Sequence, residues 1–372
     1  MEGEAPLYFV ATYYYYTFAK NKAKMSITVK QGLSGQYFSS NIPDVELSIS
    51  GYRLAATIEV DGQTIYSEHL FPVATAISLS ELGDLLTPYA RQRLVASVTV
   101  SLEEQFADTT QPTTATMQFS VVYCEADIPT SCDDFCAHHY LSLLLGTKIT
   151  ALGRLEYLHY LGTDPTVATA RYLDGTSKQF TVAAVGGNDR YTTVDVSPSG
   201  FTEEGKTLVE YQVSTGQRTQ LFRLDQQRPD CAPVLIFVNS FGCEELLYCT
   251  GTATKAPTFK RESAYIMGRQ TNYKITETRT FKADTGCLNE DMADWFSDLM
   301  RSPYVRLVTF KGGHPTISRE IVITESKSEQ TNDIDEIPRF TFSYNYAQRN
   351  HNVLELERQG RIFDNTFDFT FS

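Results

Sequence analysis

Short runs in which apolar and polar residues alternate recur along this chain, and they constrain its fold more than any other feature. Clear examples are residues 25–29, 45–49 and 54–60, and the last run ends at an Asp61-Gly62 pair that is typical of a hairpin turn. Because the side chains of a strand point alternately to its two faces, this pattern predicts half-buried strands. The 22 Tyr and 22 Phe residues favour the same structure.

Two short helices are expected to interrupt the strands and to pack on sheets. The segment from Ser78 to Glu81 looks like a capping box for a helix that Pro88 ends. A second helix is predicted over residues 289–301, where Asn289 is a good N-cap. Its apolar residues recur at helical spacing: Met292, Trp295, Phe296 and Leu299.

The length of 372 residues exceeds that of one typical domain, and breaks in the pattern predict three. We expect a multi-domain β-sandwich architecture. An N-terminal β-sandwich would span residues 1–124, a middle all-β domain residues 125–232, and a C-terminal β-rich domain residues 233–372. The last opens with a continuous apolar run over residues 234–238, which predicts a strand buried on both faces.

The charge of the chain excludes some classes of partner. A net charge of −13 without any basic run repels nucleic acid and anionic membranes, so neither is expected as a partner. No stretch approaches the roughly 18–20 apolar residues of a membrane span. The acidic N-terminus lacks the order of a secretory signal, and the seven cysteines follow no disulfide pattern, so a reducing cytoplasm is the expected site of folding.

Two groups of residues have the side-chain types that metal-dependent or nucleophilic chemistry needs. A metal site is conceivable where five potential ligands lie close in sequence: Cys132, Cys136, His138, His139 and His159. No second pair follows at zinc-knuckle spacing, so no metal and no cofactor is expected. Cys243 could form a thiol–imidazole couple with His314 or His351 for nucleophilic catalysis. A chain with seven Cys and six His offers many such couples, so this one is not specific evidence for catalysis.

A glycan-cleaving enzyme is the weaker alternative, because β-sandwich proteins often handle sugars. Its carboxylates would come from the acidic segment 325–336, which includes Asp333, Asp335 and Glu336. That segment lies between two predicted strands and is typical of a solvated loop. We therefore predict no catalytic residues and expect a protein that is not an enzyme.

The aromatic surplus is the positive functional signal. Four consecutive tyrosines in one strand would place two on each face, so one pair would point away from its own core. Tyrosine is enriched at protein interfaces and at sugar-binding platforms, although another layer of the same protein could also cover that face. The interface candidates come from the two ends of the chain: Tyr13, Tyr14, Tyr15, Tyr16, Phe363, Phe367 and Phe369.

Four segments resemble structural proteins of tailed phages and prophages of Bacteroidetes. The apolar strand and turn of residues 234–248 match their pattern, with Phe237 in place of a Trp and Cys243 in place of a second Gly. Residues 260–265, the helix and Ser-Pro element of 290–304, and residues 65–72 match further elements of the same proteins.

The resemblance implies a virion component of the tail tip or baseplate, assembled in the bacterial cytoplasm and present in several copies. Its partners would be copies of itself, other virion proteins and, as a further option, a host surface glycan. The alternative function is a carbohydrate-binding adhesin or receptor-binding module that uses tyrosines as sugar platforms.

Overall fold

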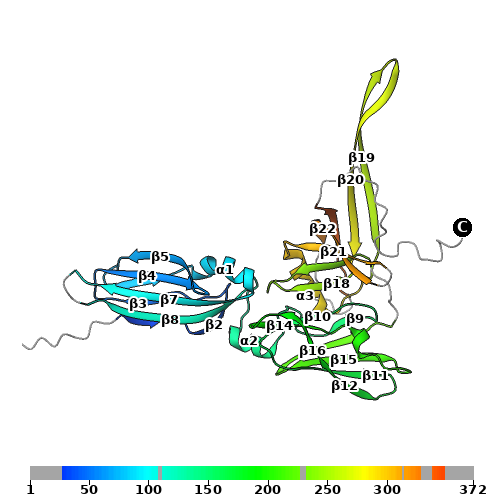
Figure 1. The fold of residues 1–372 in the computed structure, drawn as a ribbon. Helices are drawn as coiled ribbons and strands as arrows, with labels where there is room; N and C mark the ends of the chain where they lie inside the picture. Colours follow the sequence, from blue (N-terminus) through cyan, green and yellow to red (C-terminus); the bar gives the residue numbers. More distant parts are fainter. Residues whose placement is uncertain (1–26, 108–110, 227–231, 312–313, 328–336, 348–372) are drawn as a thin grey trace, which may run out of the picture.

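The computed structural model describes residues 27–107, 111–226, 232–311, 314–327 and 337–347. In this part of the chain, strands far outnumber helices and form five sheets. The prediction of a mainly β protein built from several sandwich-like units is confirmed. Figure 1 shows three groups of strands in chain order, with a long hairpin that projects from the third. The predicted boundaries at residues 124 and 232 stay predictions.

The first group, here called the N-terminal sandwich (residues 27–123), has two sheets that share one core. Leu54, Ala56, Ile58 and Val60 of one strand are buried in alternation with half-buried neighbours, as the sequence pattern predicts. The larger sheet contains, in spatial order, β2 (Gly35–Phe38), β8 (Thr113–Val122), β7 (Val95–Gln105), β4 (Arg53–Val60) and β5 (Gln63–Leu70). The smaller contains β1 (Thr28–Gln31), β3 (Val45–Ser48) and β6 (Ala76–Leu79).

Helix α1 (Leu82–Arg93) differs from its prediction at both ends. Ser78 belongs to strand β6, and the N-cap residue is Glu81, which adopts a left-handed conformation and makes no side-chain cap. Pro88 lies inside the helix rather than ending it. The capping-box prediction was therefore wrong. Ser78, which would have been the cap, is paired with Glu46 in the β6–β3 ladder instead.

The second group, here called the middle sandwich (residues 140–226), also has two sheets around one core. Its larger sheet contains β12 (Ser177–Val182), β11 (Thr166–Tyr172), β15 (Leu208–Thr215), β16 (Arg218–Leu224) and β9 (Lys148–Thr150). The smaller contains β10 (Tyr157–Leu161), β14 (Tyr191–Asp195) and β13 (Ala184–Gly187), and a short 3-10 helix, η1 (Pro198–Phe201), closes the core.

Helix α2 (Cys132–His138) connects the first two groups and was not predicted. The hydroxyl of Ser131 caps it by accepting a hydrogen bond from the Asp134 backbone N–H, and Asp133 and Asp134 lie in its first turn. These residues are a helix-start signal in the sequence. The helix has only seven residues, which is too short for a clear apolar repeat.

The third group is one seven-stranded sheet, here called the C-terminal sheet. Its strands are β18 (Glu244–Tyr248), β17 (Val234–Val238), β21 (Val305–Lys311), β22 (His314–Lys327), β23 (Thr341–Tyr346), β20 (Arg269–Asp284) and β19 (Ala253–Ile266). Leu235 and Phe237 of β17 face the core that contains helix α3, whereas Val234 and Ile236 pack with Leu155 of the middle sandwich. The prediction that β17 is buried on both faces is thus confirmed.

Helix α3 (Glu290–Arg301) forms as predicted. The Asn289 side chain accepts a hydrogen bond of 2.9 Å from the Met292 backbone N–H, which caps the helix. Met292, Trp295, Phe296 and Leu299 are all buried in the core against the C-terminal sheet. A long apolar stripe with a strong cap specifies a helix locally, and the sheet supplies the surface that the stripe needs.

Candidate functional site

The candidate functional site is the hairpin formed by β19 and β20, which extends far beyond its sheet (Figure 1). Only its base is paired to a third strand, where Phe281–Asp284 of β20 lie beside β23. From the pair Ala256–Thr280 to the pair Ile266–Arg269 the two strands have no neighbouring strand in the part of the chain that the structure describes. At 3.3–3.4 Å per residue this free part is about 35 Å long. A two-stranded hairpin of this kind is only marginally stable alone in water.

The strand register gives this hairpin one apolar face. Phe259 is paired with Glu277 and Arg261 with Ile275, so these four side chains share a face, and Tyr265 follows on the same side. The guanidinium of Arg261 lies 5.3 Å from the centre of the Phe259 ring. The opposite face carries Thr and Lys side chains: Thr258, Lys260, Thr276 and Thr278. The face with Phe259, called the apolar face here, therefore holds the larger apolar side chains beside the charged Arg261 and Glu277, and it is part of no core among the described residues.

Exposure of large apolar side chains is concentrated on this hairpin. Met267 is completely exposed and Tyr265 is 79% exposed. Further exposed side chains of the same kind lie along both strands: Phe259, Ile266, Tyr273 and Ile275. Scattered single apolar residues are normal on a protein surface, but a contiguous set on a projecting element marks an interaction site.

The tip of the hairpin has an unusual residue for its backbone conformation. Met267 and Gly268 both have positive φ angles, of 49° and 75°, as a two-residue turn of this class requires. The first position usually holds Asn, Asp or Gly, because a Cβ is unfavourable there. A fully exposed methionine in a left-handed conformation is retained at a cost, which favours a function for its side chain.

The hairpin is basic although the chain is acidic. Strands β19 and β20 contain seven Lys and Arg residues and three Asp and Glu residues, a net charge of +4. The whole chain has a net charge of −13, so the rest carries −17. The hairpin therefore combines an apolar face, an exposed tip and a charge opposite to that of the rest of the molecule.

The residues predicted as interface candidates from the sequence cannot be compared with this site. Tyr13 to Tyr16, Phe363, Phe367 and Phe369 lie outside the described residues. Part of the tyrosine surplus packs internally, since Tyr140, Tyr160, Tyr172 and Tyr211 are buried in the middle sandwich. Sequence reasoning missed the hairpin, and its only local signals were the Met267-Gly268 turn and the Lys- and Thr-rich strands on both sides.

The residues weighed for metal binding lie in separate environments. The Cys132 and Cys136 sulfurs are 3.9 Å apart and buried, whereas His159 hydrogen-bonds Thr193 and the Glu244 carbonyl. No group of three potential metal ligands occurs within the described ranges. Burial raises the pKa of the Cys243 thiol well above its usual value, which works against a nucleophilic thiolate.

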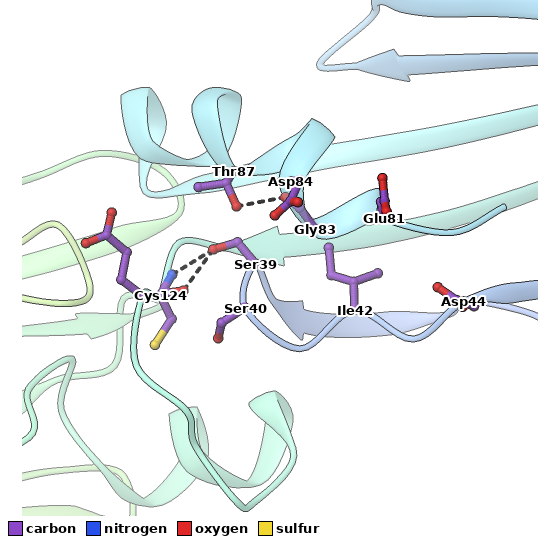
Figure 2. A pocket seen from close by; sticks show the side chains of 10 residues that line it. Ser39, Ser40, Ile42, Asp44, Glu81, Gly83, Asp84, Thr87 and Cys124 are labelled. Atoms are coloured by element: carbon purple, nitrogen blue, oxygen red, sulfur yellow. Dashed lines mark hydrogen bonds between the residues drawn. The ribbon is translucent and has the colours of Figure 1, made fainter.

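A hollow of about 370 Å³ lies beside the start of α1 and is shown in Figure 2. Its rim carries four exposed carboxylates: Asp44, Glu81, Asp84 and Glu125. The Ser39 hydroxyl donates to the Cys124 carbonyl and accepts from the Cys124 N–H, both at 3.0 Å, and Thr87 donates to the Gly83 carbonyl. Both hydroxyls hydrogen-bond backbone groups, so neither is placed as a nucleophile. The four carboxylates give the hollow a negative charge.

Three aromatic rings, from the N-terminal sandwich, the connecting helix α2 and the C-terminal sheet, pack together, and Leu161 of the middle sandwich belongs to the same buried cluster. Phe38 of β2, Phe135 of α2 and Phe241 of the turn after β17 contact one another, with ring centres 5.4–5.9 Å apart. All three are buried in one apolar cluster. Next to them Gly242 has a φ of +78°, and a Cβ there would lie 3.0 Å from the Tyr123 ring. We call this contact the aromatic joint; it holds the hairpin-bearing sheet against the N-terminal sandwich.

A buried polar network continues from the aromatic joint into the C-terminal sheet. Asp298 of α3 accepts hydrogen bonds from the Ser240 backbone N–H and hydroxyl, in the same turn as Phe241. Deeper, Trp295 donates a 2.6 Å hydrogen bond to Glu245, whose pKa is raised by burial. Buried polar groups with satisfied partners specify one arrangement of the elements that they connect.

Protonation of Asp298 is expected to make stability depend on pH. Burial raises the pKa of Asp298 from 3.8 to about 6. The folded state therefore binds this proton more tightly than the unfolded state, and the free energy of unfolding should fall as pH rises from 4 to 6, by up to about 3 kcal/mol. The measurement is urea unfolding at several pH values of the wild type and of Asp298→Asn. Parallel pH profiles of the two proteins would contradict the assignment.

Comparison with known proteins identifies no family. No protein-family model and no curated protein matches the chain. Among solved structures, the plexin A4 extracellular region aligns with 88% of this chain at 10% identity and a TM-score of 0.21, and the chain spans 40% of that region. The titin Ig tandem A164–A165 covers 54% of this chain, over 96% of its own length, at 8% identity and a TM-score of 0.23.

A protein of unknown function from Porphyromonas gingivalis W83 aligns with 54% of this chain, over 99% of its own length, at 12% identity and a TM-score of 0.18. These scores are too low to carry an argument about function. None of the helices in the described part of the chain is long and apolar enough to cross a membrane. The case for a function therefore rests on the hairpin itself.

Proposed function

We propose that this chain is a structural assembly protein that binds other protein subunits through the hairpin β19–β20 and acts in several copies. The observation that carries the proposal is a projecting hairpin about 35 Å long with exposed aromatic and aliphatic side chains that none of the described residues covers. The setting proposed from the sequence resemblance is the tail tip or baseplate of a phage virion.

The energetics favour docking. Complete burial of a Phe, Ile or Met side chain contributes about 1.5–3 kcal/mol, and six large apolar side chains of the hairpin are exposed. Burial of this set would contribute toward offsetting the loss of rotational and translational freedom on association, about 4–15 kcal/mol, together with backbone hydrogen bonds and charge attraction at the same contact. Binding would also stabilise a hairpin that is marginal by itself, so folding of the tip and assembly reinforce each other.

The rigid joint supports the same function. An assembly subunit must hold its contact surfaces in a constant orientation, and the aromatic joint connects all three groups of strands. Asp61 adds ion pairs of 2.6 Å to Arg190 of the middle sandwich and 2.7 Å to Arg93 of α1. The sheet that carries the hairpin is thus packed against the other two groups of strands, which fixes the direction in which the hairpin projects.

The proposal predicts multi-copy particles that depend on the apolar face of the hairpin. Size-exclusion chromatography with light scattering should show oligomers of the wild type, which negative-stain imaging would resolve. The variant Phe259→Ser/Tyr265→Ser/Ile275→Ser should weaken self-association at least tenfold, because it removes the apolar contact area. These side chains lie outside the described apolar cores, so the fold should be retained, as circular dichroism can verify.

The matched control is Thr258→Ser/Thr276→Ser/Thr278→Ser on the opposite face of the same strands. It should assemble as the wild type does. A wild type that stays monomeric at every concentration up to the millimolar range would overturn the proposal. Equal loss in both triple variants would show that the apolar face has no special role.

A further inference from the structure

We infer that the hairpin of one copy binds the open edge of strand β5 on the N-terminal sandwich of a second copy. This inference rests on the proposed function and specifies the partner surface. Donor and acceptor would then be different surfaces of the same chain, so each copy could bind one neighbour with its hairpin and receive another at β5. Such a contact joins subunits head to tail and builds a ring or a filament.

Charge complementarity selects a second copy as the partner. The hairpin has a net charge of +4, whereas residues 27–107 of the N-terminal sandwich contain nine Asp and Glu and four Lys and Arg residues. Among the described residues only one of these nine carboxylates, Asp61, takes part in an ion pair. The N-terminal sandwich therefore offers negative charge that this chain does not neutralise.

The middle sandwich is a poorer acceptor although it is also acidic. Residues 140–226 contain nine Asp and Glu and eight Lys and Arg residues, so their net charge is only −1. Four of these carboxylates form ion pairs within the chain: Glu156, Asp164, Glu203 and Glu210. Its open edge strand β12 contains Lys178, which would repel a basic hairpin. Attraction of charges steers association and rejects wrong partners, so this difference favours the N-terminal sandwich.

Strand β5 supplies the matching backbone and apolar surface. Among the described residues it is an edge strand that pairs with β4 alone, so one row of its backbone N–H and C=O groups has no described strand beside it. It has eight residues, fewer than the free part of the hairpin, and it carries Glu68. Just beyond its end, Phe71 and Val73 are 67% and 83% exposed. An extended strand added to this edge would pair its backbone, cover these side chains and place Lys or Arg near Glu68.

The geometry of the subunit fits an intermolecular contact. Figure 1 shows the hairpin tip and the N-terminal sandwich at separate ends of the molecule, with the aromatic joint between them. Because the joint fixes these parts relative to each other, a copy cannot fold its own hairpin onto its own β5. The donor of one copy and the acceptor of another remain available to each other.

Two complementary variants test the inference. In the donor-deleted variant, residues 257–279 are replaced by Asn-Gly, which joins the paired residues Ala256 and Thr280 with a two-residue turn. In the acceptor-blocked variant, Glu68→Lys, Phe71→Ser and Val73→Ser change the β5 edge. Each variant alone should be monomeric by light scattering. A one-to-one mixture should form a heterodimer and nothing larger, because only one donor and one acceptor remain.

The matched control carries Leu173→Ser, Val185→Ser and Glu204→Lys, the same kinds of change at exposed positions of the middle sandwich. It should assemble like the wild type, and thermal unfolding should show that all variants are folded. If the acceptor-blocked variant associates with itself and the donor-deleted variant binds neither itself nor the acceptor-blocked variant, then hairpins bind each other. That result would overturn the inference and leave the proposed function intact. A mixture that stays monomeric would also overturn it, whereas a monomeric wild type would overturn both.

Discussion

Replacing Phe241 by alanine is expected to lower the free energy of unfolding by about 3–5 kcal/mol, the usual cost of removing a buried phenylalanine ring. Phe241 is completely buried and contacts both Phe38 and Phe135. The cavity would open at the contact shared by three groups of strands, where collapse of one group cannot fill it without moving another. Urea unfolding of the purified protein measures the effect.

The same variant should also loosen the subunit. Because the aromatic joint connects the N-terminal sandwich to the C-terminal sheet, small-angle X-ray scattering should show a larger radius of gyration for Phe241→Ala in dilute solution. Leu173→Ala is the control, since this side chain is 74% exposed and its loss should change stability by less than about 0.5 kcal/mol. Equal stability losses in the two variants would refute the role of the joint.

Replacing Lys148 by methionine is expected to have an effect of similar size. Lys148 is buried, forms a 2.7 Å ion pair with Glu156 and lies 4.7 Å from the centre of the Trp295 ring. Removing one member of a buried ion pair leaves the other charge without compensation in a medium of low polarity, which costs about 3–5 kcal/mol. Thermal and urea unfolding should both report this loss.

Two further variants separate charge from packing. Lys178→Met removes a lysine whose 3.2 Å pair with Glu203 is largely exposed, and it should cost less than about 1 kcal/mol. The double variant Lys148→Met/Glu156→Gln also removes the uncompensated negative charge of Glu156, and it should recover part of the stability lost in Lys148→Met. A double variant less stable than the single one would show that the packing of the lysine side chain, rather than its charge, dominates.

Local sequence patterns predicted the elements that their own residues specify. Helix α3 has a side-chain cap at Asn289 and an apolar stripe of four residues, and strand β17 is a continuous apolar run. Helix α1 was misjudged at its start, because pairing between β6 and β3 outweighed a capping signal of about 1 kcal/mol. Helix α2 was missed because seven residues do not establish a period.

The projecting hairpin could not be predicted from local sequence patterns for a different reason. The sequence analysis did not predict a hairpin over residues 253–284, and the propensity of a segment for strand does not say what covers either of its faces. For β4 an opposing sheet covers one face, whereas β23 pairs with Phe281–Asp284 of β20 and no other described strand lies beside the rest of the hairpin. The hairpin projects because strand β23, about sixty residues away in sequence, ends beside the base of β20.

By itself, therefore, the sequence determined the mainly β fold, the strand β17 and the helix α3, since these depend on the order of neighbouring side chains. Only the tertiary structure decided that three groups of strands meet at Phe38, Phe135 and Phe241, and that the hairpin extends beyond its sheet. Contacts between distant segments are set by the shapes of complete sheets. No short window of sequence contains that information.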